Sequence, residues 1–115
     1  MAKLTITLTS APPVTIKKDD WPIIARAKWH DGQVECQANR TRTLIVRQHE
    51  DGRAIVYGVY STQWQGESDR RRGVYLADNP NSLHIVRTIC EVADSMGFDE
   101  DFAEECIANL PAVEV

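Results

Sequence analysis

The sequence predicts an α+β domain in which an antiparallel sheet of about four to five strands carries helices packed on one face. Three observations predict this class. Residues 41–60 hold two runs rich in β-branched and aromatic residues on either side of Asp51-Gly52, which is a strong hairpin signal. Residues 3–10 alternate apolar residues with threonines, as a half-buried strand does. Apolar residues recur at helical spacing near the C-terminus.

The stretch before the hairpin is predicted to hold a strand, a helix and a second strand. The strand at residues 3–10 ends at two prolines, which cannot donate to a sheet ladder. A helix is predicted over residues 20–29, because an aspartate can cap its first turn and a proline is tolerated there. Residues 33–40 are expected to form the next strand. The residues that share one stripe at helical spacing, and so favour the helix, are Trp21, Ile24, Ala25 and Lys28.

After the hairpin, residues 61–73 are polar and are predicted to form a long loop. Residues 74–77 return as a short strand. Helices are predicted over residues 82–96 and 99–110, and Gly97 is expected to end the first of them. Helices that gather on one face leave the second face of the sheet free for a partner.

The length of 115 residues suits one domain, spanning residues 1–115. Hydrophobic content of 43% and charged content of 26% are ordinary for a globular protein. No apolar run approaches the roughly 20 residues that span a bilayer, so we expect no membrane association and a cytoplasmic location. The expected core comprises Leu4, Ile6, Trp21, Ile24, Leu44, Val46, Ile55, Tyr57, Val86, Ile89 and Phe102.

The sequence carries no signature of catalysis, and we predict a protein that is not an enzyme and needs no metal or cofactor. Its three cysteines are odd in number and widely spaced, which argues against a disulfide framework and against a zinc site. Its three histidines stand apart from one another in the sequence. No nucleophile elbow, phosphate-binding glycine loop or His-Glu-x-x-His pattern is present.

The charge is divided unevenly along the chain. Residues 1–77 carry 12 Lys and Arg against 8 Asp and Glu, whereas residues 78–115 carry one Arg against nine acidic residues. The acidic C-terminal part has two readings. Its carboxylates can mimic phosphates and occupy a basic groove on another protein, or they can form an ordinary solvated helix face.

The basic part of the sequence contains the candidate contact residues. Arginines interleaved with aromatic residues suit nucleic acid, since cations pair with phosphates and aromatic faces stack on bases. The expected α-β-β-β-α order is similar to that of double-stranded RNA binding domains, but residues 78–83 lack the lysines that such domains carry there. The residues predicted to contact a partner are Trp64, Arg70, Arg71, Arg72 and Arg53.

Residues 20–25, 47–58 and 105–112 together resemble small uncharacterised proteins carried by phages, plasmids and integrated elements of Gram-negative bacteria. This resemblance implies a genomic context and carries no catalytic residues with it. Small acidic accessory proteins of mobile elements often act by binding. Some block host defence complexes, as anti-CRISPR proteins do, and others bind nucleic acid.

We therefore expect a non-enzymatic binding protein of a phage or mobile element. Its expected partner is a host protein or ribonucleoprotein complex, which it inhibits or links as an adaptor. Direct nucleic-acid binding through the basic sheet and the arginines at 70–72 is the alternative. A homodimer joined by an edge strand, such as residues 4–8, is a further alternative.

Overall fold

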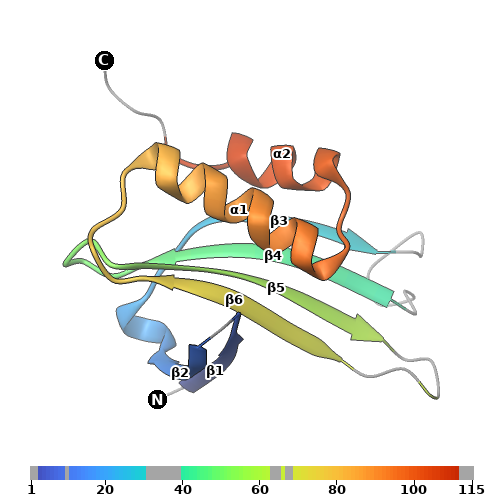
Figure 1. Cartoon of the computed structure of the whole chain (residues 1–115), viewed down its shortest axis with the longest axis horizontal. Coiled ribbons are helices and arrows are strands. Elements are labelled where there is room, and N and C mark those ends of the chain that lie inside the picture. Colours follow the sequence, from blue (N-terminus) through green and yellow to red (C-terminus); the bar gives the residue numbers. More distant parts are fainter. Residues whose placement is uncertain (1–2, 10, 31–39, 63–65, 67–68, 112–115) are drawn as a thin grey trace.

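The computed structural model describes residues 3–9, 11–30, 40–62, 66 and 69–111. Within them, six strands form one sheet in the order β2-β1-β6-β5-β4-β3, and two helices follow (Figure 1). The predicted α+β class is confirmed, but the sheet has six strands rather than four to five, and it is mixed because β1 and β6 run parallel. The elements are β1 Lys3–Leu8, β2 Ala11–Lys17, a 3-10 turn Lys18–Asp20, β3 Ile23–His30, β4 Arg40–Gln48, β5 Ala54–Thr62, β6 Arg70–Leu76, α1 Ser82–Met96 and α2 Glu100–Ala108.

The predicted hairpin at residues 41–60 is the centre of the sheet. Strands β4 and β5 pair over their whole length, from Arg40 opposite Thr62 to Gln48 opposite Ala54. The backbone N–H of His49 donates to the Arg53 carbonyl at 2.8 Å and closes the turn. Gly52 has φ of 98°, a conformation that side chains rarely allow and glycine permits.

The two helices cover one face of β3–β6, as predicted, and lie above the sheet in Figure 1. The side chain of Asn81 accepts the His84 backbone N–H at 2.8 Å and begins α1, and Gly97 with φ of 73° ends it. Beneath the helices, fully buried residues from both layers form the larger core. Its most buried members are Leu44, Val46, Ala54, Val56, Ile89 and Cys106.

The predicted helix over residues 20–29 is wrong, because residues 23–30 form the edge strand β3. Ala25 and Ala27 are buried beneath α2, whereas Arg26 and Lys28 are exposed, and this is the period-two alternation of a strand. Pairing with β4 satisfies the backbone of this segment and overrides its helical spacing. The similarity to the double-stranded RNA binding order is lost with this helix.

The opposite face of the sheet is not left free along its whole length, contrary to prediction. The β1–β2 hairpin is part of the same sheet, but it lies below strands β3–β6 in Figure 1 and packs a second core against them. Trp21 closes one side of this core from the turn before β3. The buried residues of the second core are Leu4, Ile6, Ile16, Trp21, Ile55 and Tyr57.

Strand β1 joins the sheet at a short parallel contact, in which Thr7 lies opposite Arg72 and Leu8 opposite Gly73. A Cβ at Gly73 would lie 2.4 Å from the Val56 carbonyl oxygen, so only glycine fits. Because β1 lies between β2 and β6, it is not an edge strand. The predicted dimer through residues 4–8 is therefore wrong in its choice of strand.

Two further predictions concern segments that the structure describes only in part. Of the predicted strand at 33–40, only Arg40 is described, and it opens β4. The predicted loop over 61–73 is too long, since β5 runs to Thr62 and β6 begins at Arg70.

Of the eleven expected core residues nine are buried, and Ile24 and Val86 are half-buried.

Candidate functional site

Four residues line up across the sheet on its helix-covered side, one on each of four neighbouring strands. Trp29 on β3 lies opposite Arg42 on β4, Arg42 opposite Tyr60 on β5, and Tyr60 opposite Arg70 on β6. Cross-strand partners project from the same face, so the four side chains form one line of alternating aromatic rings and guanidinium groups. We call these four residues the open row.

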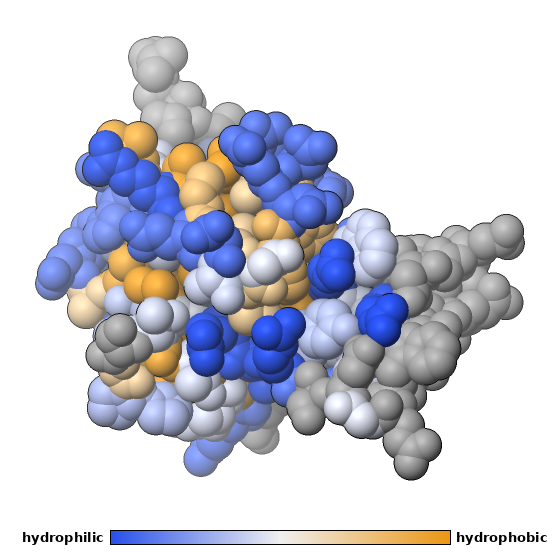
Figure 2. Space-filling model, turned by 45° about the vertical axis from the view of Figure 1, so that its right-hand side comes forward, coloured by the Kyte–Doolittle hydropathy of each residue, from blue (hydrophilic) through white to orange (hydrophobic). Residues whose placement is uncertain are grey.

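The open row lies beyond the helices because α1 ends above Gly58, two residues before Tyr60. A Cβ at Gly58 would lie 3.0 Å from Met96 Cγ and 3.1 Å from Phe98 Cε2, so the helix layer presses directly on the strand there. One step further along the strands, Trp29 is 39% exposed, whereas Tyr60 is half-buried and packs against the edge of the larger core. In Figure 2, which brings this end forward, deep-blue hydrophilic residues alternate with paler ones beside the grey loops.

The arginines of the open row stack on the rings beside them. Arg42 Cζ lies 4.6 Å from the centroid of the Trp29 ring, and Arg70 Cζ lies 5.1 Å from that of Tyr60. A guanidinium that stacks on a ring can still use the N–H donors on its edge for hydrogen bonds. Neither arginine forms an ion pair with any residue that the structure describes.

A second group of arginine and aromatic residues lies at the other end of the sheet, around the β4–β5 turn. Arg53 Cζ lies 5.2 Å from the Trp21 ring centroid, and the Trp21 ring makes an edge contact with His49 at 5.2 Å. Arg53 also donates to the Tyr75 hydroxyl at 3.2 Å. We call these four residues, Trp21, His49, Arg53 and Tyr75, the tip cluster.

Asp51 holds Arg53 of the tip cluster in place by two hydrogen bonds. The Arg53 backbone N–H donates to Asp51 Oδ1 at 3.0 Å, and Arg53 Nε donates to Oδ2 at 2.7 Å. These bonds, the backbone one foremost, lower the pKa of the Asp51 carboxyl below its ordinary value. The bonds to Tyr75 and Asp51 raise the pKa of Arg53.

Arg47 is a buried arginine that serves the second core. Its Nε donates to the Tyr57 hydroxyl and its Nη1 to the Trp21 carbonyl, both at 2.9 Å. These two bonds tie β4 to β5 and to the turn before β3. We therefore regard Arg47 as a structural residue.

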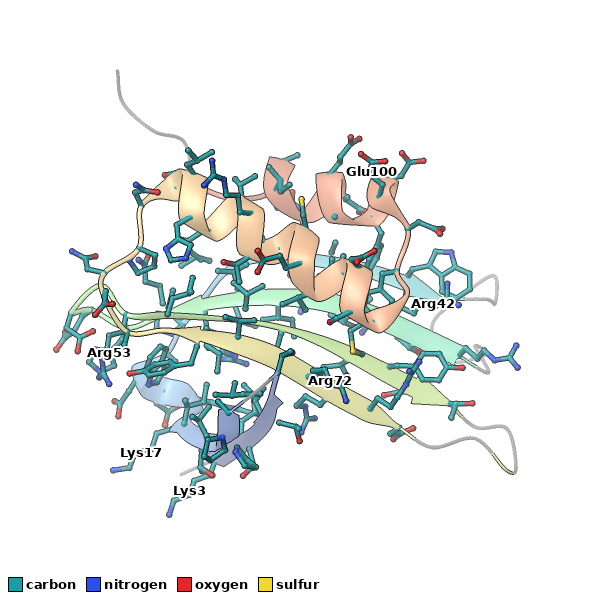
Figure 3. The ribbon with its side chains drawn as sticks, viewed as in Figure 1. Lys3, Lys17, Arg42, Arg53, Arg72 and Glu100 are labelled. Carbon is teal, nitrogen blue, oxygen red and sulfur yellow. The ribbon has the colours of Figure 1, made fainter. Side chains whose placement is uncertain are left out.

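The structure divides the sequence-predicted contact residues. Arg70 and Arg72 alternate with Arg71 along β6, so only Arg70 and Arg72 face the helix side. Arg53 belongs to the tip cluster, and Figure 3 shows it at the end of the sheet opposite to Arg42. The prediction for Trp64 falls outside the described residues.

Sequence reasoning counted Arg42 and Tyr60 among the arginine and aromatic residues of the basic part, but it did not join them with Trp29 as one site. The register of the hairpin follows from its turn and already places Arg42 opposite Tyr60, so this pair was within reach. Trp29 could not be assigned to the site from the sequence, because the segment that contains it was predicted as a helix. A strand in place of that helix adds the fourth position to the line.

Other features of the described residues offer no stronger site. A cavity of about 540 Å³ lies between the start of α1 and the end of α2, far from the open row, and its lining holds no charged side chain. No three metal-ligating side chains gather in the described part of the chain. Burial raises the pKa of the Cys106 thiol to about 11, so this cysteine stays protonated.

Neither described helix combines the length and apolar character that crossing a membrane requires. Comparison with known proteins adds no relative to this picture. No protein-family model, no curated protein and no solved structure matches the chain.

Proposed function

We propose that this protein binds single-stranded nucleic acid across the open row, in the cytoplasm. The observation that carries the proposal is the register that aligns the open row across four strands, with Trp29 and Arg70 exposed and Arg42 and Tyr60 half-buried. Single strands are bound without strict sequence preference by aromatic faces that stack on bases and by cations that follow the backbone. The open row supplies both groups in alternation.

The dimensions of the open row suit a short stretch of single strand. Neighbouring strands lie about 4.8 Å apart, so the two aromatic rings on β3 and β5 are separated by roughly 10 Å and the row spans roughly 14 Å. Each ring adjoins an arginine that forms no ion pair with the described residues. A duplex cannot present its bases to these rings, because its bases are already stacked on one another.

The test is fluorescence anisotropy with labelled 12-nucleotide RNA and DNA strands at low and moderate salt. Tyr60→Leu keeps an apolar side chain on β5 while removing the ring, and it should weaken binding by roughly 5- to 100-fold, since base stacking contributes about 1–3 kcal/mol. Arg42→Gln should weaken binding and reduce its salt dependence.

Arg53→Gln is the matched control, because Arg53 also stacks on a tryptophan but lies in the tip cluster. This variant should bind like the wild-type protein. Wild-type protein that fails to bind either strand at low salt contradicts the proposal. An effect of Arg53→Gln equal to that of Arg42→Gln would contradict the location of the site.

The second candidate is the predicted one, in which this is a phage or mobile-element protein that binds a host protein or ribonucleoprotein complex as an anti-CRISPR-like inhibitor or adaptor. Exposed carboxylates on the helix layer support it, because they could occupy a basic groove. Glu100 lies on the outer side of this layer in Figure 3. The exposed carboxylates of the helix layer are Glu91, Asp94, Asp99, Glu100, Asp101, Glu104 and Glu105.

A tagged pull-down from host lysate with and without nuclease separates the two candidates. A specific protein that survives nuclease, and is lost when Glu100, Asp101 and Glu104 are changed to their amides, favours the inhibitor. Recovery of nucleic acid alone, lost in moderate salt and in Tyr60→Leu, favours the open row.

A further inference from the structure

We propose that a hollow beside the open row binds one phosphate group of the same nucleic-acid strand, and that Arg72 is the residue that pairs with it. This inference rests on the proposed function and adds a position to its site. The hollow has a volume of about 260 Å³ and lies where β6 meets β1 beneath the end of α1. Its lining residues are Thr7, Asp69, Arg70, Arg71, Arg72, Ser95 and Met96.

The hollow continues the open row at its β6 end. Arg70 belongs to both, since it stacks on Tyr60 and lines the hollow. Arg72 is the next residue of β6 on the same face, opposite Gly58 on one side and Thr7 on the other. A strand whose base stacks on Tyr60 therefore has its neighbouring backbone directly over the hollow.

The groups in the hollow favour an anion. The side chain of Arg72 is exposed and forms no ion pair with any described residue, so its guanidinium can take a phosphate in a bidentate manner. Thr7 adds an exposed hydroxyl from β1. Ser95 adds no free proton, because its hydroxyl donates to the Val92 carbonyl at 2.9 Å.

One carboxylate, Asp69, also lines the hollow, and its role there is structural. Its Oδ1 accepts the Thr62 backbone N–H at 2.9 Å, which ties the end of β5 to the start of β6. The arginines outnumber this single carboxylate, and an added phosphate restores the balance. The same contact holds Arg70 in register with Tyr60.

An arginine outside the hollow provides a matched control. Arg26 on β3 is exposed, does not line the hollow, and projects from the face opposite to the helices, because it alternates with the buried Ala25 and Ala27. Gln retains most of the length of either side chain and removes the charge. Arg72→Gln and Arg26→Gln therefore change the net charge of the protein equally and differ in whether the hollow loses it.

The experiment measures the affinity of both variants for the labelled 12-nucleotide strand over a series of salt concentrations. Arg72→Gln should bind about tenfold more weakly at low salt, the loss expected for one charged hydrogen-bonding contact. Its slope of log affinity against log salt should be smaller by about 0.7, because one fewer counterion is released from a single strand. Arg26→Gln should match the wild-type protein in both quantities.

The outcomes separate this inference from the proposed function. Wild-type binding with equal behaviour of the two variants overturns the phosphate hollow and leaves the open row standing. No binding by the wild-type protein overturns both. Arg72→Lys, which keeps the charge, should preserve the salt slope, and a slope lost in this variant as well would show that Arg72 acts by holding the β1–β6 junction instead.

If the hollow recognises free phosphate rather than the strand, millimolar inorganic phosphate should compete with the strand more strongly than sulfate or chloride at equal ionic strength. Competition that follows ionic strength alone supports the strand phosphate as the ligand. Unfolding curves for every variant confirm that differences in binding arise in folded protein.

Discussion

The open row and the tip cluster both combine arginine with aromatic side chains and lie at opposite ends of one sheet. They differ in what surrounds them. Each stacks an arginine on a tryptophan. Trp21 is only 6% exposed, whereas Trp29 is 39% exposed. Arg53 is bonded to Asp51 and Tyr75, whereas Arg42 makes its ring contact without an ion pair to any described residue. An arginine on a tryptophan is therefore a structural contact where a hairpin and a carboxylate enclose it, and it forms the proposed binding surface where neither does.

The largest expected difference is in stability. Trp21→Ala removes a buried ring from the second core and should lower the free energy of unfolding by about 3–5 kcal/mol. Trp29→Ala removes an exposed ring with one cation–π contact and should lower it by no more than about 1 kcal/mol. Urea unfolding of both variants measures the difference. Similar midpoints for the two variants would contradict the comparison.

A smaller difference is expected for two arginines on β4. Arg47→Met fills similar space but leaves the Tyr57 hydroxyl and the Trp21 carbonyl without their donor, so it should cost about 1–3 kcal/mol of stability. Arg42→Met, the control on the same strand, should stay within about 1 kcal/mol of the wild-type protein. Urea unfolding again provides the measurement. A cost for Arg42→Met as large as that for Arg47→Met would show that the open row is structural too.

The smallest effect concerns pH. The pKa of Asp51 is lowered below 3.8 in the folded protein, so its contribution to stability is present above that value and is lost as pH falls through the lowered pKa. The open row has no carboxylate among its four residues and should keep its arrangement over the same range. Carboxyl chemical shifts followed by NMR during an acid titration give the pKa directly. Arg53→Gln should raise this pKa only in part, because it keeps the backbone N–H bond to Asp51. An Asp51 pKa at or above 3.8 in the wild-type protein would contradict this account.

The sequence predicted those parts of the fold in which local and tertiary preferences agree. The Asp51-Gly52 turn set the hairpin, and Asn81 and Gly97 bracketed the helix that was predicted at residues 82–96. Residues 20–29 carried two patterns at once. The stripe of Trp21, Ile24 and Ala25 has helical spacing, and the alternation of alanines with Arg26 and Lys28 has strand spacing. Only pairing with β4 decides between them.

The candidate site was harder to predict than the fold, because it is a property of register across four strands. A triplet of arginines in a polar stretch suggested one cationic loop. The triplet instead opens β6, in which the side chain of Arg71 projects from the face opposite to those of Arg70 and Arg72. Trp29 and Arg70 are far apart in the sequence and lie in one line only after β3, β4, β5 and β6 have paired. Composition drew attention to arginine and aromatic residues but could not show that four of them form one row.

The parallel contact between β1 and β6 has a consequence for the order of folding. Strands β3 to β6 each pair with their neighbour in the sequence, so their loops close over short separations. Thr7 and Arg72 must instead meet across most of the chain, and the entropy lost in closing so long a loop is compensated only when the second core forms. The N-terminal hairpin is thus expected to dock last and detach first. Amide protons of β1 and β2 should therefore exchange with solvent sooner than those of β4 and β5.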